Sequence, residues 1–366
     1  MINKNEFSCG MRKFVFFIDF LQYLTSDILK IKLSDIKKTY LCGMEWKKYN
    51  YHFEGLEKYL VRIEEKKAKL DALRPLPSIA VRKIKESLTL EWTYNSNGIE
   101  GNTMTLQETK MVIEEGMTVK GKSLREHFEV VNHNDAIEYL ETLISDKYIL
   151  KENDIMELHN LVLQKIEKDF AGRYRNAGVR ISCVNFVLPN ALKVNDLMSD
   201  LVRWTNEENV DLNVIIKAAI FHHRFVWIHP FFDGNGRTVR LSFNLLLMKE
   251  GFPPAIILKN DRKKYYDALN RANNGDYSKL LLLVLQAVER SLDIYVGSLT
   301  NTYDNYLPIS ELVTESTMPY GQEYISLLAR QGKIDAFKEG RNWHTSREAV
   351  TDYISKRERK RTLNKE

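Results

Sequence analysis

The chain has 366 residues, of which 44% are hydrophobic and 28% charged, so it can bury one large domain and carry one or two small modules. Its net charge of +5 is too weak a bias, averaged over the whole chain, to indicate a nucleic-acid-binding protein. The three widely spaced cysteines, Cys9, Cys42 and Cys183, form no CxxC pair, which disfavours a disulfide framework or a zinc–thiolate site and indicates a reducing cytoplasm.

The first 43 residues differ from the rest in composition and in the spacing of their apolar residues, and a different sequence pattern begins at Met44. The segment "MRKFVFFIDFLQYL" (11–24) imitates a signal peptide, but Asp19 interrupts its apolar run and no small-residue cleavage site follows. No stretch approaches the roughly 20 apolar residues that a membrane span needs. We therefore expect a cytoplasmic protein without membrane contacts, in which residues 1–43 are a loosely ordered extension or precede the biological start.

Amphipathic spacing predicts two helices near the N-terminus, over 54–73 and 78–96. Their apolar sides carry Leu56, Leu60, Ile63 and Leu70 in the first helix and Ile79, Ile84, Leu88 and Trp92 in the second. The segment "SNGIEGNTMT" then favours a helix end and a turn. A third helix follows, N-capped by Thr105 or Thr103 and ended by Gly116.

The next part of the chain is mostly helical with one small β element. Helices are predicted over 123–146, 153–166, 193–206, 211–227, 236–250, 261–272 and 276–300. Between the second and third of these, "VRISCVNFVLP" (179–189) is rich in β-branched residues, partly alternating and closed by Pro189. This composition predicts a short strand or hairpin.

Residues 303–366 read as a separate module: a helix, a turn, a helix, two short strands around "EGRN" and a final helix. This order resembles a winged helix or helix-turn-helix module. Its basic residues, Arg330, Lys333, Lys338, Arg341 and the tail "KRERKR", could meet the phosphates of DNA. A protein-docking module with a solvated basic tail is the alternative, and the sequence slightly favours it.

The stretch "IHPFFDGNGRTVR" (228–240) places dense polar chemistry between two apolar helices. Pro230 resists continuation of the preceding helix, and Gly234 and Gly236 allow backbone conformations that other residues avoid. A glycine-lined turn that feeds a helix N-terminus offers free backbone N–H groups and the positive end of the helix dipole. The stretch therefore predicts an anion site, with phosphate as the usual anion.

Side chains of the same stretch add to this chemistry. Arg237 and Arg240 share a helix face with Asn244, and two guanidinium groups beside such a site favour more than one phosphate. Asp233 supplies a hard oxygen ligand for Mg²⁺. His229 is the titratable group nearest to the reacting phosphate and suits general-base catalysis.

Two plainer interpretations compete with this one. In the first, the stretch is a helix–turn–helix corner whose histidine and arginines cap helix ends, which suits any single residue but not the whole set. In the second, His222, His223 and His229 bind zinc, but the HExxH pattern is missing and the arginines stay unexplained.

The stretch matches His-x-Phe-x-Asp/Glu-Gly-Asn-Gly-Arg-x-x-Arg, the signature of the Fic domain family, at every fixed position. The chain resembles this family over about residues 125–300. The resemblance implies transfer of AMP from ATP to a Ser, Thr or Tyr hydroxyl of a target protein. It assigns the hydroxyl proton to His229, Mg²⁺ (or Mn²⁺) to Asp233, the anion hole to Asn235 and the backbone of 234–236, the β-phosphate to Arg237 and the γ-phosphate to Arg240.

Two further features follow from the resemblance. A kinase-like branch of the family has Lys in place of Gly236, so the glycine favours AMP transfer over phosphotransfer. The predicted hairpin lies where the family has a flap that aligns the target chain by strand addition. The flap residues are Ile181, Ser182, Cys183 and Val184. As local structure, an ordinary surface hairpin explains the segment equally well.

Upstream, Ser96, Glu100, Gly101 and Asn102 resemble the inhibitory motif Ser/Thr-x-x-x-Glu-Gly/Asn of many Fic proteins. Its position before the core implies an N-terminal inhibitory helix, in which the glutamate pairs with the second signature arginine, Arg240, and blocks the γ-phosphate position. In some relatives the same glutamate supports removal of AMP. The sequence does not decide which direction dominates.

We therefore expect a mainly α protein, with a Fic-type helical bundle, a hairpin flap and a winged-helix-like module. The expected regions are an extension (1–43), a helical region with the inhibitory motif (44–122), the catalytic core (123–300) and the C-terminal module (303–366). The expected function is an autoinhibited protein adenylyltransferase, with a homodimer by analogy. The alternative is a DNA-binding regulator whose core binds nucleotide with little turnover.

Overall fold

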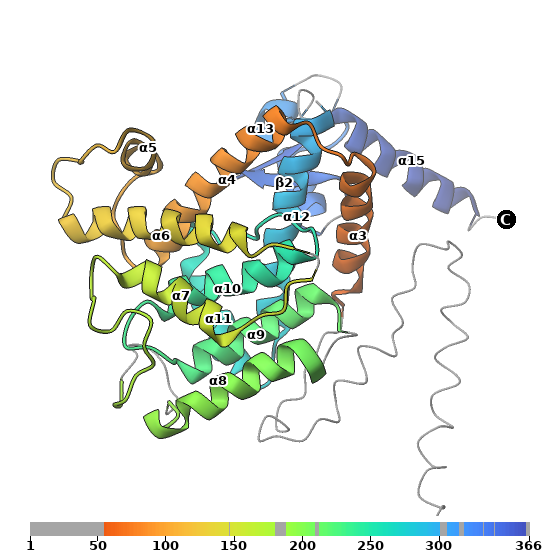
Figure 1. Cartoon of the computed structure of the whole chain (residues 1–366). Coiled ribbons are helices and arrows are strands. Elements are labelled where there is room, and N and C mark those ends of the chain that lie inside the picture. The colour runs from red at the N-terminus through yellow and green to blue at the C-terminus, as the bar shows by residue number, and fades with distance from the viewer. Residues whose placement is uncertain are drawn as a thin grey trace, which may run out of the picture. The chain divides into compact units, whose positions relative to one another are not determined.

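The computed structural model describes residues 55–145, 147–179, 188–208, 212–300, 306–314, 318–331, 333–339 and 341–363. Within them, helices surround a central helical core and one small sheet lies near the C-terminus (Figure 1). The mainly helical fold class is as predicted. The predicted extension over 1–43 and the flap residues Ile181, Ser182, Cys183 and Val184 lie outside the described residues.

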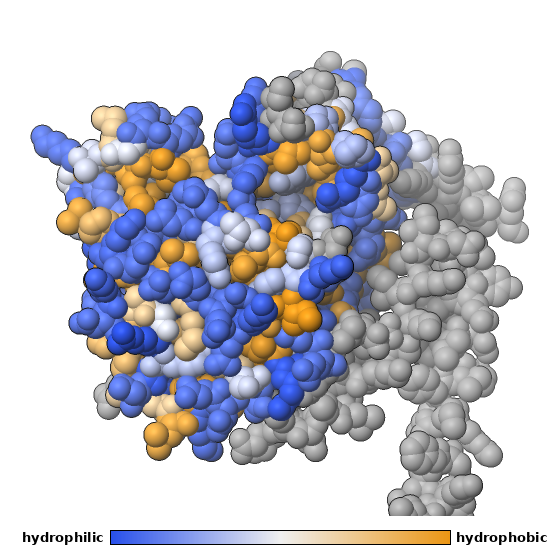
Figure 2. Space-filling model, in the orientation of Figure 1, coloured by the Kyte–Doolittle hydropathy of each residue, from blue (hydrophilic) through white to orange (hydrophobic). Residues whose placement is uncertain are grey.

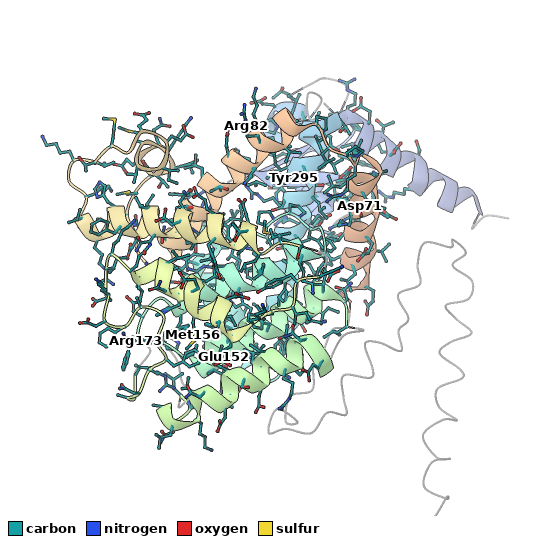
Figure 3. All side chains as sticks on the ribbon, in the orientation of Figure 1. Asp71, Arg82, Glu152, Met156, Arg173 and Tyr295 are labelled. Atoms are coloured by element: carbon teal, nitrogen blue, oxygen red, sulfur yellow. The ribbon has the colours of Figure 1, made fainter. Side chains whose placement is uncertain are left out.

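The three N-terminal helices are α3 (Glu57–Ala72), α4 (Ser78–Ile99) and α5 (Leu106–Glu115). Both α3 and α5 follow the prediction, and α5 has the expected caps: Thr105 forms a capping box with Glu108, and Gly116 ends the helix at φ 63°. The side chains are drawn in Figure 3, where Asp71 marks α3 and Arg82 marks α4.

The predicted end of the second helix at residue 96 is wrong, because α4 continues through Asn97 and Gly98 to Ile99. Ile99 is fully buried, and Asn97 Nδ2 donates to the backbone carbonyl of Glu129 at 3.1 Å. A Cβ at Gly98 would lie 2.5 Å from Cδ of Lys259, so this glycine allows close approach within the helix and does not mark a turn. Tertiary packing here overrides the weak local preference.

Seven further helices build the core around the signature stretch. They are α6 (Leu124–Thr142), α7 (Glu152–Leu163), α8 (Val194–Arg203), α9 (Val214–Ile228), α10 (Asn235–Lys249), α11 (Arg262–Ala272) and α12 (Ser278–Thr300). The predicted helices are all found, although α6 ends at Thr142 and α8 passes into a π-helical turn, Trp204–Glu208.

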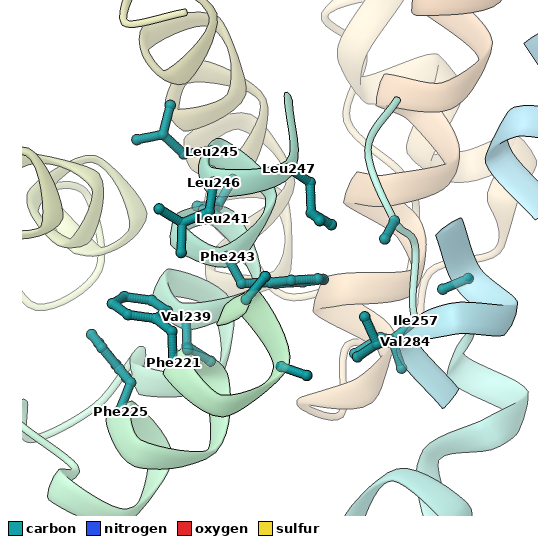
Figure 4. Packing of buried hydrophobic residues seen from close by; sticks show 14 of the residues in the cluster. Phe221, Phe225, Val239, Leu241, Phe243, Leu245, Leu246, Leu247, Ile257 and Val284 are labelled. Carbon is teal, nitrogen blue, oxygen red and sulfur yellow. The ribbon is translucent and has the colours of Figure 1, made fainter. Parts of the chain in front are cut away.

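Helix α10 lies at the centre and contacts α9, α7, α6 and α4. Buried residues lie on nearly every side of α9 and α10, and in α10 several of them are polar or charged. Figure 4 shows Phe221 and Phe225 of α9 beside Val239 of α10, all of them fully buried. The signature stretch joins these two most buried helices, so the core fixes both of its ends.

The C-terminal residues form a small sheet with three helices. Its elements are β1 (Leu307–Pro308), α13 (Ile309–Leu312), α14 (Gln322–Arg330), β2 (Ala336–Glu339), β3 (Asn342–Thr345) and α15 (Arg347–Leu363). The antiparallel order is β1-β3-β2, with Thr345 opposite both Leu307 and Ala336. The prediction missed β1, which is only two residues long and includes a proline.

This part has its own hydrophobic cluster, made by Ile309, Leu312, Ile325, Leu328, Ala329, Ile334 and Val350.

On the face drawn in Figure 2, hydrophilic residues cover most of the described surface, and hydrophobic residues form separate patches. None of the described helices is long and apolar enough to cross a membrane.

Candidate active site

The turn between α9 and α10 is shaped by three residues. His229 ends α9 in the left-handed conformation (φ 49°), because Pro230 disfavours continuation of the helix. Gly234 (φ 73°) caps α10, and a Cβ there would lie 3.3 Å from the ring of His159. The helix begins at Asn235, so the backbone N–H groups of its first turn have no partner within the helix.

Gly236 does not have the special backbone conformation that the sequence suggested; it lies inside α10. Its role is to leave space. A Cβ at this position would overlap Glu100 Oε1 and lie 3.0 Å from Nη1 of Arg240. The missing side chain therefore makes room for whatever group approaches Arg240 from this side.

The Asn235 side chain is used by the turn itself. Its Nδ2 donates to the carbonyl of Phe231 at 2.8 Å, and its Oδ1 accepts from the Phe231 backbone N–H at 2.9 Å. The residue is buried. The backbone N–H groups at the start of α10, and not this amide, are the donors that the turn leaves for an anion.

His159 of α7 packs against the turn between α9 and α10, and the sequence did not single it out. Its Nδ1 accepts from the Gly172 N–H at 2.9 Å, so the protonated Nε2 donates to the carbonyl of Asp233 at 3.0 Å. The ring stacks on Phe231 at 3.6 Å, and burial lowers its pKa to about 4. In Figure 3, Glu152 and Met156 mark α7.

Arg175 holds the other side of the turn and was also missed. Its Nε donates to the carbonyl of His229 at 2.8 Å, its Nη2 to that of Pro189 at 2.6 Å, and its backbone N–H to that of Pro230 at 2.8 Å. Burial lowers the pKa of this guanidinium. Contacts that join residues 14 to 55 positions apart leave no local sequence signal.

His229 is a neutral imidazole near pH 7. Burial and, to a smaller extent, the positive charge of Arg175 lower its pKa to about 4, against opposing effects of the Val226 carbonyl, Glu100 and Asp233. The ring can therefore accept a proton without first losing one.

The signature arginines are both buried, with 2% exposure each. Among the described residues, Nε and Nη1 of Arg237 and Nη1 of Arg240 have no hydrogen-bond partner. The nearest carboxylate oxygens to Arg237 are those of Glu129 at 3.4 Å and Asp233 at 3.7 Å. Because native proteins rarely leave buried guanidinium hydrogens unused, these groups fit a polyanionic ligand.

Arg240 also contacts the motif that the sequence predicts to be inhibitory. Its Nη2 donates to Glu100 Oε1 at 2.7 Å and to the Ser96 carbonyl at 2.8 Å, and its Nε donates to Ser96 Oγ at 3.1 Å. Burial lowers the pKa of Arg240, but Glu100, Tyr265 and Tyr266 together raise it above its ordinary value, so the guanidinium stays charged.

Gly101 and Asn102, the other two motif residues, shape the turn after α4. Gly101 has a left-handed backbone (φ 106°), which favours glycine. Asn102 Nδ2 donates to Glu129 Oε2 at 2.9 Å, and its Oδ1 accepts from the Met104 N–H at 3.0 Å. Asn102 therefore connects the predicted inhibitory segment (96–102) to the glutamate beside Arg237.

Asp233 lies at the mouth of the site, with its side chain 45% exposed. In the described part of the chain, no group of three or more His, Cys, Asp or Glu residues could hold a metal ion. A cation at Asp233 would take phosphate oxygens and water as its other ligands, which is how Mg²⁺ usually binds with nucleotides. His222 and His223, which the zinc interpretation grouped with His229, are instead hydrogen-bonded to Tyr265 and Tyr277, respectively, in the core.

Comparison with known proteins identifies related sequences. A sequence model of the Fic/DOC family matches residues 149–247. The protein adenylyltransferase Fic of Nematostella vectensis is 39% identical over 246 residues, which cover 67% of this chain and 57% of that protein. That of Aedes aegypti is 34% identical over 286 residues, 78% of this chain and 56% of that protein. The chain spans about half the length of the curated relatives that it matches.

Solved structures extend the similarity to the fold. A fragment of Fic-1 from C. elegans has a TM-score of 0.61 and 33% identity, and the match covers 67% of this chain and 74% of that chain. A Fic domain containing signaling protein from Bacteroides thetaiotaomicron has a TM-score of 0.61 and 27% identity, with 66% and 97% covered.

Proposed function

Because this chain belongs to the Fic/DOC family, we propose that it is an autoinhibited protein adenylyltransferase, which transfers AMP from ATP to a Ser, Thr or Tyr hydroxyl of a target protein. One observation carries the proposal. A neutral imidazole, a half-exposed carboxylate and two buried arginines converge on the N-terminus of α10. These are the groups that phosphoryl-group chemistry needs for proton transfer and charge stabilisation.

In the proposed reaction, His229 accepts the proton of the target hydroxyl as its oxygen attacks the α-phosphorus. The new bond joins this oxygen to phosphorus, the bond from phosphorus to the bridging oxygen of the β-phosphate breaks, and pyrophosphate leaves. Arg237 and Arg240 bind the oxygens of the β- and γ-phosphates, on which the leaving group's charge develops. A divalent cation held by Asp233 would neutralise part of that charge.

Glu100 blocks this arrangement by taking Arg240 from the γ-phosphate. A carboxylate 2.7 Å from the guanidinium forms the same charge-assisted hydrogen bond that a phosphate oxygen would form. Each such bond is worth roughly 1.5–3 kcal/mol, so its loss should raise the competent population about 10- to 150-fold.

We therefore expect the Glu100→Gly variant to label itself or added proteins with AMP about 10- to 150-fold faster than the wild-type chain. Glu115→Gly is the matched control, because Glu115 is an exposed glutamate at the end of α5 and lies outside the site. Equal rates for Glu100→Gly and the wild type would show that Glu100 does not restrain the reaction.

The nature of the transferred group is tested with two labels. Glu100→Gly is incubated with ATP labelled at either the α- or the γ-phosphate, and protein-bound label is counted. The proposal expects α-label on protein, no γ-label, and loss of the α-label in Glu100→Gly/His229→Ala. Transfer of γ-label would indicate a kinase. Salt-sensitive DNA binding with neither label would favour the regulator instead.

A further inference from the structure

Arg125, in the first turn of α6, engages the carboxylate that the proposed reaction needs for its cation. Its Nη2 lies 2.8 Å from Oδ2 of Asp233. The other oxygen, Oδ1, accepts the backbone N–H of Gly234 at 2.6 Å. Both oxygens of Asp233 therefore already have hydrogen-bond donors.

Arg125 has two other carboxylates within reach. Its Nε lies 3.6 Å from Oε1 of Glu129, and its Nη1 lies 3.5 Å from Oε1 of Glu167. The side chain is 49% exposed, so it can rotate away from Asp233 without leaving a buried charge unpaired. Release from Asp233 would leave the guanidinium between two carboxylates that already attract it.

We propose that Arg125 is a positioning residue that holds Asp233 until a divalent cation displaces it, and thereby sets the cation concentration at which nucleotide binds productively. The inference rests on the proposed function, in which Asp233 is the cation ligand. A guanidinium and a divalent cation on the same carboxylate repel each other, because both are positive. Binding of the cation to Asp233 therefore opposes the contact between Arg125 and Asp233.

The contact also lies close to the first signature arginine. Glu129, the second partner of Arg125, is the glutamate 3.4 Å from Arg237 and accepts from Asn102 of the inhibitory segment. When Arg125 moves from Asp233 toward Glu129, it competes with Arg237 for that carboxylate. This competition would weaken the ion pair between Glu129 and Arg237, whose Nε and Nη1 already lack hydrogen-bond partners among the described residues, at the step in which the cation arrives.

The test measures binding and not turnover. Mn²⁺ is titrated into full-length protein in the presence of α,β-methylene-ATP, and bound Mn²⁺ is followed by electron paramagnetic resonance. All variants carry Glu100→Gly, so that Arg240 is free. Arg125→Ala is compared with Arg203→Ala, an arginine of similar exposure (46%) that pairs with Asp200 at 2.6 Å on another helix.

We expect Arg125→Ala to lower the half-saturating Mn²⁺ concentration about 3- to 10-fold, and Arg203→Ala to leave it unchanged. An unchanged or higher value for Arg125→Ala would overturn the inference, the higher value showing that Arg125 helps to bind the phosphates. Asp233→Asn separates the two proposals. If Asp233→Asn binds Mn²⁺ with the same affinity as the Glu100→Gly protein, the cation site of the proposed function is wrong, whatever the effect of Arg125→Ala.

Discussion

Arg175 donates to the backbone carbonyls of His229, Pro189 and Ala177. Its guanidinium therefore fixes the position of the His229 backbone at the end of α9, while the imidazole ring stays available for the proposed reaction. Burying a guanidinium whose partners are neutral backbone carbonyls costs free energy. We infer that Arg175 is used to fix the geometry of this turn more than to stabilise the fold.

Replacement of Arg175 should consequently affect turnover more than nucleotide binding. In the Glu100→Gly background, we expect Arg175→Ala to lower kcat at least about 10-fold, since small misplacements of a catalytic group are costly. The dissociation constant for α,β-methylene-ATP should change much less. Arg173→Ala, in the same loop and exposed (Figure 3), is the control. A loss confined to nucleotide affinity would contradict the assigned role.

The residues that could be predicted from the sequence were those gathered in short stretches. His229, Asp233, Arg237 and Arg240 lie within twelve positions, so their shared chemistry is visible without a structure. Three others, Arg125, His159 and Arg175, reach the same turn from distant segments. An isolated arginine or histidine carries no sign of a partner 50 or 100 residues away, so only the fold reveals these contacts.

At the scale of elements, α4 is an integral helix of the fold. Leu88, Trp92 and Ile99 are buried, Asn95 Oδ1 accepts from the Lys259 N–H at 2.8 Å, and Arg262 Nε donates to the Ile99 carbonyl at 2.7 Å. These contacts do not involve Glu100. The proposed inhibition therefore depends on one carboxylate at the end of a firmly packed helix.

Hydrogen–deuterium exchange can check this account of α4. We expect a peptide covering residues 88–99 to exchange at the same rate in the wild-type chain and in Glu100→Gly, because the packing and side-chain hydrogen bonds of the helix remain. Faster exchange in the variant would mean that activation requires the helix to loosen. A peptide from α10 provides the internal reference for a buried helix.

The same helix shows why element ends were harder to predict than element types. Helical spacing from Ile84 to Trp92 identified α4, but Asn97-Gly98 suggested an end that the packing overrides. In contrast, the ends of α5 were predicted well, since Thr105 and Gly116 determine them through local hydrogen bonds and backbone conformation. Local chemistry can be inferred from a sequence more readily than contacts between helices.

At the scale of the whole molecule, four buried histidines link stability to pH. Burial lowers the pKa of all four, which are His133, His159, His222 and His223. For His159 and His223 the pKa falls to about 4. Below the ordinary histidine pKa, the unfolded chain takes up protons that the folded chain does not. The free energy of unfolding must then fall as pH falls from about 7 toward 4.

We expect denaturant unfolding at pH 5 to show a clearly lower free energy than at pH 7, with about 1–2 kcal/mol lost for each of His159 and His223. Asp293 and Glu64 act in the opposite direction, because burial raises the pKa of both carboxyl groups, for Asp293 to about 7, but they are two groups against five histidines when His229 is included. An equal or higher free energy of unfolding at pH 5 would contradict the neutral, buried state of these histidines.

The central claim is that Glu100 and the terminal phosphate of ATP compete for Arg240. The most direct test is the ratio of the dissociation constants of AMP and ATP, measured by calorimetry in the wild-type chain, Glu100→Gly and the control Glu115→Gly. Since AMP lacks the γ-phosphate, removing Glu100 should strengthen ATP binding selectively and raise this ratio at least about 10-fold, with no change in the control. The same ratio in all three proteins would contradict the claim.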